Sequence, residues 1–294
     1  MELGRVGLWT HALDMQPIAR SQELAAELDE LGFGSILLPE MAGRDPLVFS
    51  AQLLGATERI VIGTGIAGIY SRDALTMNGG HRALTEAFPD RFLLGMGVSH
   101  AVAVEGLRGQ TYDKPLTKMR EYLDAMDHAP YFAYRADVTP VRVLAALGPK
   151  MLELAASRTA GAHPYFVPVE HTAFAREHLG PDALLLPEQK VVLETDPDAA
   201  RTIGRRAMAI YLTLPNYTNN LRRFGYDDAD FADGGSDRLV DAIVAWGDED
   251  AIKARVDAHH AAGANHVAVQ VVPADTAPDA VPMAEWRRLA AALL

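Results

Sequence analysis

Polar side chains follow three of the apolar, strand-like runs in this sequence, and these positions could carry acid–base chemistry. His11 follows the run 5–9, Glu40 follows the run 35–39, and His100 follows the run 92–97. An imidazole with a pKa near neutrality can donate or accept a proton, and a carboxylate can accept a proton or bind substrate. His11, Glu40 and His100 are therefore the candidate catalytic residues. Each has a structural alternative: backbone groups can satisfy the histidines, and Glu40 can pair with Arg72.

The other strand ends are rich in glycine and apolar residues. A mouth of this composition suits a flat, π-rich cofactor that performs the redox chemistry itself. The residues at these ends are Gly65, Ile66, Ala67, Val98, Ser99, Gly148, Val167, Pro168 and Val169.

Hydrolytic and metal-dependent chemistries lack their usual residues. The chain has no cysteine, no His-x-His after the first strand and no His-Glu-x-x-His, so we expect no metal site. The stretch Gly97–Ala101 lacks the second glycine of a nucleophile elbow, which disfavours a serine hydrolase.

Net charge and the length of the apolar stretches limit the kinds of partner that we expect for this protein. A formal net charge of −12 argues against nucleic acid or an anionic membrane surface as the main partner, because both reward clustered Lys and Arg. No apolar stretch approaches the roughly 18 residues of a membrane span, and no signal peptide is evident at the N-terminus. We expect a cytoplasmic protein that acts on a small molecule.

Short apolar runs alternate with segments of helical period along the whole chain, which is typical of βα units. The pairs Asp45-Pro46 and Asp196-Pro197 are typical of helix starts, with Asp as the N-cap and Pro in the first turn. Gly32 is typical of a helix end. The turn after the first strand holds Thr10-His11-Ala12 in place of a glycine-rich dinucleotide fingerprint, so a (β/α)8 barrel is favoured over an open sheet. The predicted strands are 5–9, 35–39, 60–66, 92–97, 141–146, 162–167, 184–193 and 266–272.

The least periodic part of the chain lies between the last two predicted strands. We interpret residues 212–247 as an insertion that covers the barrel mouth within a single domain, 1–294. Its segment 217–223 lines either a substrate pocket or a solvated lid surface. His259-His260 falls in the middle of a later helix and is interpreted as non-functional, on the barrel exterior.

Several stretches, in this order and spacing, resemble the luciferase-like monooxygenase superfamily, and within it the actinobacterial oxidoreductases that use coenzyme F420, a deazaflavin. The stretches are 26–35, 62–66, 91–97, 145–161, 247–250 and 262–267. The resemblance implies a luciferase-like TIM barrel that transfers a hydride between F420 and a small organic substrate. It also implies a homodimer packed through barrel helices.

The resemblance implies roles for several residues. Gly65-Ile66 matches the bulge where family members hold a non-proline cis peptide against the cofactor ring, and Gly148 matches a close approach of backbone to the cofactor. Residues 167–169 match the loop that receives its phosphate. Met41 and His100 stand where well-studied deazaflavin dehydrogenases have a histidine and a glutamate, so their acid–base scheme does not carry over.

Three alternatives stay open at this point. The cofactor could be FMN, with oxygen as co-substrate in a monooxygenase reaction. The missing acid–base pair could mark a non-catalytic F420-binding paralogue. A metal-dependent barrel hydrolase would reveal itself by bound zinc.

Overall fold

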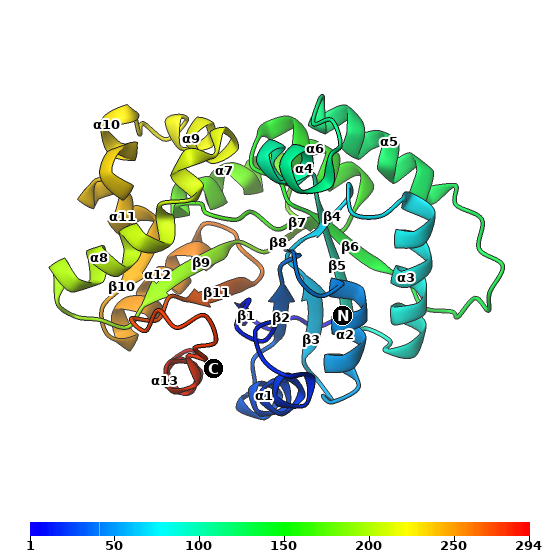
Figure 1. Cartoon of the computed structure of the whole chain (residues 1–294), viewed down its shortest axis with the longest axis horizontal. Helices are drawn as coiled ribbons and strands as arrows, with labels where there is room; N and C mark the ends of the chain where they lie inside the picture. The colour runs from blue at the N-terminus through cyan, green and yellow to red at the C-terminus, as the bar shows by residue number, and fades with distance from the viewer. Residues whose placement is uncertain (41) are drawn as a thin grey trace.

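A single parallel sheet of eleven strands forms the centre of the molecule, which is described here from a computed structural model covering residues 1–40 and 42–294. One ladder runs through β1, β2, β3, β5, β6, β7 and β8, and a second joins β9 to β11 and β11 back to β1. Only Leu186 and Pro187 separate β8 from β9, so the stretch from Leu184 to Val192 connects the two ladders into a ring (Figure 1). The predicted barrel is confirmed. These strands are β1 (Val6–Trp9), β2 (Ser35–Leu38), β3 (Val61–Thr64), β5 (Phe92–Gly97), β6 (Val141–Leu144), β7 (Gly161–Ala162), β8 (Leu184–Leu185), β9 (Glu188–Val192) and β11 (Val267–Val271).

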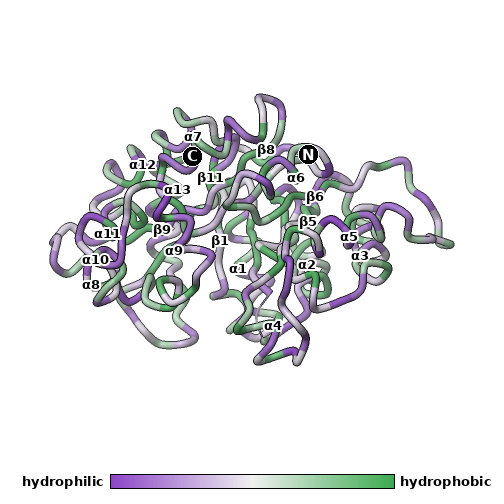
Figure 2. Tube along the Cα trace, turned by 90° about the horizontal axis from the view of Figure 1, so that it is seen from above, coloured by the Kyte–Doolittle hydropathy of each residue, from purple (hydrophilic) through white to green (hydrophobic). Residues whose placement is uncertain are grey.

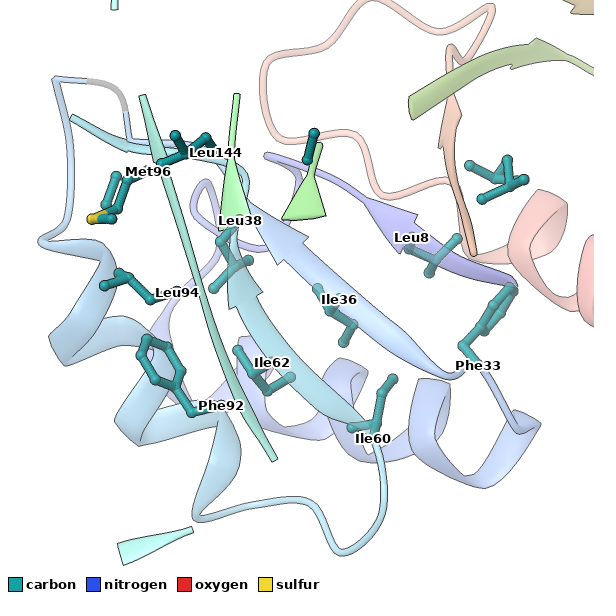
Figure 3. Close-up of a cluster of buried hydrophobic side chains, with 14 of the residues drawn as sticks. Leu8, Phe33, Ile36, Leu38, Ile60, Ile62, Phe92, Leu94, Met96 and Leu144 are labelled. Carbon is teal, nitrogen blue, oxygen red and sulfur yellow. The ribbon is translucent and has the colours of Figure 1, made fainter. Parts of the chain in front are cut away.

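Alternation along the strands divides the core into two parts, because successive side chains of a strand point to opposite faces. Ile36, Ile62 and Leu94 belong to the large cluster that packs under the surrounding helices, and Figure 3 shows them on neighbouring strands. Leu37 and Leu93, one position away, belong to a second cluster inside the ring that also contains Trp9. The inner cluster fills the lower barrel, so a cavity can form only at the strand ends above it.

Helices surround the sheet, and several begin and end at the residues expected. The Asp45 side chain accepts hydrogen bonds from the backbone N–H groups of Leu47 and Val48, the Asp196 side chain caps α8, and Gly32 ends α1 in a left-handed conformation. The helices are α1 (Ile18–Leu31), α2 (Pro46–Leu54), α3 (Ala74–Ala87), α4 (Ala101–Arg108), α5 (Pro115–Asp127), α6 (Pro149–Arg158), α7 (Val169–Leu179), α8 (Pro197–Met208), α12 (Glu249–Ala261) and α13 (Met283–Leu293).

Apolar stretches gather around the strands, whereas outer segments such as α8 are largely hydrophilic (Figure 2). In the part of the chain that the structure describes, no helix combines the length and apolarity needed to cross a bilayer.

Four predicted strands are too long. The strand 60–66 ends at Thr64, and the strand 141–146 ends at Leu144. The other two are interrupted at prolines. The predicted strand 162–167 is confined to Gly161–Ala162, and the predicted strand 184–193 is divided into β8 and β9. The physical reason is proline: Pro164 and Pro187 have no backbone N–H for the ladder. The carbonyls of both prolines still accept hydrogen bonds, from the N–H groups of Glu188 and Ala268, so the ring stays joined there.

The aperiodic segment 212–247 is folded into short elements. They are η1 (Tyr211–Thr213), α9 (Pro215–Arg222), α10 (Asp228–Phe231), η2 (Ala232–Gly234), α11 (Asp237–Ile243) and β10 (Val244–Trp246), and β10 extends the sheet beside β9. Local signals for them exist in the sequence: Pro215 stands at a helix start, and Asp227 and Ser236 accept hydrogen bonds as helix caps. These elements bury an apolar cluster of their own against β9 and Phe166. A further short strand, β4 (Ala67–Gly68), pairs with β5.

His259 does not lie on the barrel exterior as predicted. Its side chain is fully buried between α12 and α7, where Nδ1 lies 2.8 Å from Thr172 Oγ1 and Nε2 lies 2.9 Å from Gln189 Oε1. The residue therefore joins two helices to β9, which is a structural role.

Five buried histidines should make the protein acid-sensitive. Burial lowers the pKa of His81 and His259 to about 3, and that of His163, His171 and His266 to about 4, from an ordinary value of 6.5. Between pH 6.5 and these values the unfolded chain binds protons that the folded protein does not, so stability falls as pH falls. Between pH 6.5 and pH 5.0 each site lowers the free energy of unfolding by about 2 kcal/mol, against a typical total of about 5–15 kcal/mol.

We therefore expect the Tm to fall markedly between pH 7.5 and pH 5.0 in a thermal unfolding series. His81→Gln removes one contributing imidazole and should reduce this difference, while His128→Gln, at an exposed position, should retain it. A Tm independent of pH over this range would contradict the interpretation.

Candidate functional site

A cavity of about 1360 Å³ opens at the carboxyl ends of the strands. Pockets for drug-sized ligands usually measure about 300–1,000 Å³, so this one has room for a large cofactor and a substrate together. Its lining comes from the ends of β1, β2, β3, β5 and β6, from α4, from the segment after β7 and from the segment 210–223. The lining residues include Trp9, Glu40, Gly65, Ile66, Gly97, Val98, Ser99, His100, Ala145, Gly148, Tyr165, Tyr211, Tyr217 and Arg223.

One wall of the cavity is built from small residues around the bond between Gly65 and Ile66, which is cis as predicted. Trp9 fixes this bond by donating a hydrogen bond from Nε1 to the Gly65 carbonyl oxygen at 2.6 Å. A side chain at Gly97 would meet Ile66 Cδ1 at 2.7 Å and the Ala145 Cβ at 3.2 Å. A side chain at Gly97 would therefore displace the Ile66 side chain, and Gly65, Gly97 and Ala145 add little or no side chain of their own to this wall beside Ile66. We call these four residues the glycine wall.

The cavity also has an aromatic side, formed by Tyr165, Tyr211 and Tyr217. The Tyr165 ring lies 5.0 Å from the Trp9 ring and 5.3 Å from the Tyr211 ring. The Tyr165 and Tyr211 hydroxyl oxygens are 2.7 Å apart. Behind them lies a buried pair of charged residues, Glu188 and Lys190. Of this aromatic side, only Tyr217 lies in a segment expected to line a pocket, although a Glu and a Lys inside the apolar run 184–193 are a visible signal.

Glu40 pairs with Arg72, the structural alternative for this residue. Its two carboxylate oxygens accept hydrogen bonds from both terminal nitrogens of Arg72, each at 3.0 Å, and the two side chains are only 7% and 8% exposed. The same carboxylate accepts the Gly68 N–H at 2.7 Å and lies 3.4 Å from Arg108. Its acceptor capacity is therefore used in holding the cavity rim together.

His100 lies at the start of α4 and meets the insertion across the mouth. Its Nδ1 is 3.2 Å from Asn216 Oδ1, and its ring lies 5.4 Å from that of Tyr217. Burial lowers the pKa of His100 below its ordinary value, and the hydrogen bond to Asn216 opposes this shift. The imidazole is thus predominantly neutral at pH 7 and links the two sides of the entrance.

The structure brings some of the predicted site residues together and leaves others apart. Glu40, Gly65, Ile66, Val98, Ser99, His100 and Gly148 line the cavity, whereas His11, Ala67, Val167, Pro168 and Val169 are not among its lining residues. His11 lies beside Trp9, at a ring separation of 6.4 Å, and Ala67 is buried in β4. Met41, noted as a departure from the family pattern, lies outside the described residues. Tyr217 and Arg223 line the cavity, so the segment 217–223 forms part of a pocket instead of a solvated lid surface.

A positively charged corner lies at the N-terminus of α6. Gly148 is the N-cap residue of this helix, and a side chain there would meet Arg223 Nη2 at 3.4 Å. Free N–H groups at a helix start and a guanidinium together favour an anion. The predicted phosphate loop, residues 167–169, starts α7 outside the cavity lining, with Glu170 exposed in its first turn. The α6 corner therefore fits an anionic group better than the predicted loop.

Comparison with known proteins now identifies the family. The model of the luciferase-like monooxygenase family matches residues 1–266. The chain belongs to this family. A Mycobacterium tuberculosis protein named as a coenzyme F420-dependent oxidoreductase is 32% identical over 125 residues, a match covering 42% of this chain and 35% of that protein's length. The 5,10-methylenetetrahydromethanopterin reductase of Methanolobus tindarius is 24% identical over 82% of this chain and 86% of its own length.

Several solved structures share the fold along nearly the whole chain. An F420-dependent secondary alcohol dehydrogenase, solved with an F420-acetone adduct, superposes with a TM-score of 0.77 at 13% identity, over 99% of this chain and 98% of that one. The F420-dependent tetrahydromethanopterin reductase of Methanopyrus kandleri gives 0.75 at 17% identity, over 98% and 97%. An FMN-bound Baeyer-Villiger monooxygenase component of Pseudomonas putida gives 0.65 at 16% identity, over 97% and 95%. At these sequence identities the similarity shows a shared fold and nothing about shared activity.

Proposed function

We propose that this protein is an oxidoreductase that transfers a hydride between coenzyme F420 and a small organic substrate. The observation that carries the proposal is the glycine wall, which lines a cavity that is large enough for cofactor and substrate. Similarity to proteins named for F420 supports deazaflavin as the cofactor. When bound, a deazaflavin supplies or accepts the hydride, and the protein binds, orients and protonates.

The residues of the cavity fit such a cofactor in two places. The glycine wall would hold one face of the tricyclic ring, because a flat ring packs closely only where side chains are short. The N–H groups at the start of α6, with Arg223, would hold the phosphate. The aromatic side would then face the substrate across the ring.

FMN is the second candidate, because an FMN-bound monooxygenase component shares the fold. An FMN enzyme would consume oxygen during turnover, and a deazaflavin enzyme would not. The corner at Gly148 and Arg223 suits the phosphate of either cofactor, so this corner does not separate them.

Titration with F420 and with FMN, read by tryptophan fluorescence, tests the proposal. Trp9 contacts Gly65 through its indole, so a ring bound on the glycine wall should quench its emission. We expect saturable quenching by F420 at much lower concentration than by FMN, and a smaller signal in Trp9→Phe. Tighter binding of FMN than of F420 would make FMN the cofactor. If neither F420 nor FMN binds, the proposal is overturned.

A homodimer and a cytoplasmic setting are further parts of this proposal. They rest on the family resemblance, and analytical ultracentrifugation of the purified protein would test the dimer.

A further inference from the structure

The buried pair of Glu188 and Lys190 lies directly behind the aromatic side of the cavity. Both side chains are 1% exposed, and Lys190 Nζ lies 3.1 Å from Glu188 Oε1. Removing two charges from water costs several kcal/mol for each ion, and apolar residues at such positions are often at least as stable. Stability alone therefore gives little reason for this pair, and its surroundings indicate what it does.

Each member of the pair contacts an aromatic residue in or next to the cavity wall. Glu188 Oε2 accepts the backbone N–H of Phe166 at 3.1 Å, and Phe166 has the left-handed φ of 59°, which costs a non-glycine residue roughly 1–2 kcal/mol. Lys190 Nζ lies 4.0 Å from the Tyr165 ring centroid and 4.8 Å from that of Tyr211. The pair thus fixes the turn that carries Tyr165 and places a cation beneath both tyrosines.

The hydrogen bonds of this cluster determine which groups donate and which accept. Gln270 Oε1 lies 3.3 Å from Lys190 Nζ and 2.8 Å from the Tyr165 hydroxyl. An ammonium group can only donate, so the Gln270 atom that faces it is the oxygen, and this oxygen accepts the Tyr165 proton. The Tyr165 oxygen is then free to accept the proton of Tyr211, 2.7 Å away. This leaves the Tyr211 oxygen with lone pairs for a donor in the cavity.

The same chain can also run in the opposite direction. Hydroxyl protons rotate, so Tyr165 can donate to Tyr211 and Tyr211 can donate into the cavity once the Gln270 side chain turns its oxygen away from Tyr165, because two acceptor oxygens do not stay 2.8 Å apart without a proton between them. In one direction Tyr211 accepts from a substrate hydroxyl, and in the other it donates to a substrate carbonyl. An alcohol hydroxyl can donate a hydrogen bond, whereas a ketone oxygen can only accept one. The Tyr211 hydroxyl can therefore bind either compound.

We infer that the Tyr211 hydroxyl, backed by Tyr165, binds the oxygen of a carbonyl or alcohol substrate and transfers the proton that accompanies the hydride. The inference rests on the proposed function and deepens it, since it selects substrates whose reacting group carries oxygen. Glu188, Lys190 and Gln270 are positioning residues. Burial raises the pKa of Tyr211 to about 12, so its hydroxyl keeps its proton at neutral pH.

The proton balance follows from this placement. In ketone reduction the carbonyl carbon gains a hydride from the reduced cofactor, the π electron pair of the C=O bond moves to oxygen, and that oxygen takes the Tyr211 proton. The product is the alcohol. Tyr211 is left as a phenolate, which the Lys190 ammonium stabilises through the low-dielectric interior until solvent in the open cavity returns a proton. Alcohol oxidation runs through the same steps in reverse.

Tyr211→Phe tests the inference, because it removes one oxygen atom and keeps the ring. The probes are cyclohexanone and methylenecyclohexane, which share a shape but differ in the oxygen, bound to the protein loaded with oxidised F420. We expect cyclohexanone to bind roughly 2- to 10-fold more weakly to the variant than to wild type, and methylenecyclohexane to bind equally to both. Tyr134→Phe, whose residue is 74% exposed on the segment between α5 and β6, is the matched control and should bind both probes as wild type does.

Turnover provides a second measurement on the same proteins. Tyr211→Phe is expected to lower kcat for ketone reduction by about 10²- to 10⁴-fold, the usual range for loss of a general acid, with a much smaller change in KM. The double variant Glu188→Gln with Lys190→Met removes both charges without leaving one unpaired. It should keep the affinity for cyclohexanone and lower kcat, because it retains the Tyr211 hydroxyl and loses the cation that stabilises the phenolate.

Two results would overturn the inference: no binding of cyclohexanone to wild type, or equal effects of Tyr211→Phe on the two probes. The cofactor Kd of each variant is measured first and should match wild type. If F420 fails to bind wild type, the proposed function fails. The probe comparison on the cofactor-free protein would still decide whether Tyr211 binds a carbonyl oxygen.

Discussion

Replacing Ala145 with phenylalanine is expected to weaken F420 binding by roughly 100-fold or more, because a steric conflict of about 3 kcal/mol corresponds to a factor of this size in Kd. Ala145 lines the cavity beside Gly97, whose missing side chain would come within 3.2 Å of the Ala145 Cβ. A benzyl group there would occupy the space over the glycine wall that the proposal gives to the cofactor ring. Fluorescence titration with F420 measures the effect.

The matched control for this variant is Ala133→Phe, at an exposed position in the segment between α5 and β6 that projects from the barrel (Figure 1). It adds the same side chain far from the cavity and should leave the Kd unchanged. Circular dichroism shows whether both variants are folded. A folded Ala145→Phe protein that binds F420 as tightly as wild type would remove the glycine wall from the proposed cofactor site.

Replacing Glu40 with alanine is expected to lower the free energy of unfolding by about 3–5 kcal/mol, the usual cost of leaving a buried charge without its partner. Arg72 is 8% exposed and would keep only Asp45, which is 46% exposed, as a carboxylate partner. The Gly68 N–H would also lose its acceptor. Urea unfolding measures the change.

Glu23→Ala is the control, since Glu23 pairs with Arg20 at positions where both side chains are at least half exposed, and such pairs contribute at most about 1 kcal/mol. The comparison also separates the two roles considered for Glu40. If Glu40→Ala keeps the stability of wild type and loses turnover, Glu40 acts on the substrate and its pairing with Arg72 is secondary.

Local patterns predicted the barrel well, because its strands and helix ends are encoded within a few residues. The run 92–97 became β5 with the predicted bounds, and Asp45, Asp196 and Gly32 start or end helices where expected. Four strands were predicted too long, and in two of them a proline removes a ladder donor, at Pro164 and Pro187. Apolar composition alone does not reveal that loss.

The two sides of the cavity differ in how far the sequence could predict them. The glycine wall comes from three strand ends with family-like motifs, and its cis bond was expected. The aromatic side brings together Tyr165, Lys190, Tyr211 and Gln270, which span 105 positions along the chain, so no local spacing joins them. Tyr211 begins η1, directly before the insertion 212–247, and this part of the chain has little periodicity to interpret.

A crystal structure of the protein with oxidised F420 tests the central claim most directly. We predict that the tricyclic ring lies on Gly65 and Ile66, with its phosphate at the start of α6 near Arg223. A ring bound elsewhere in the cavity, with no contact to the Gly65–Ile66 bond, would contradict this account of the site.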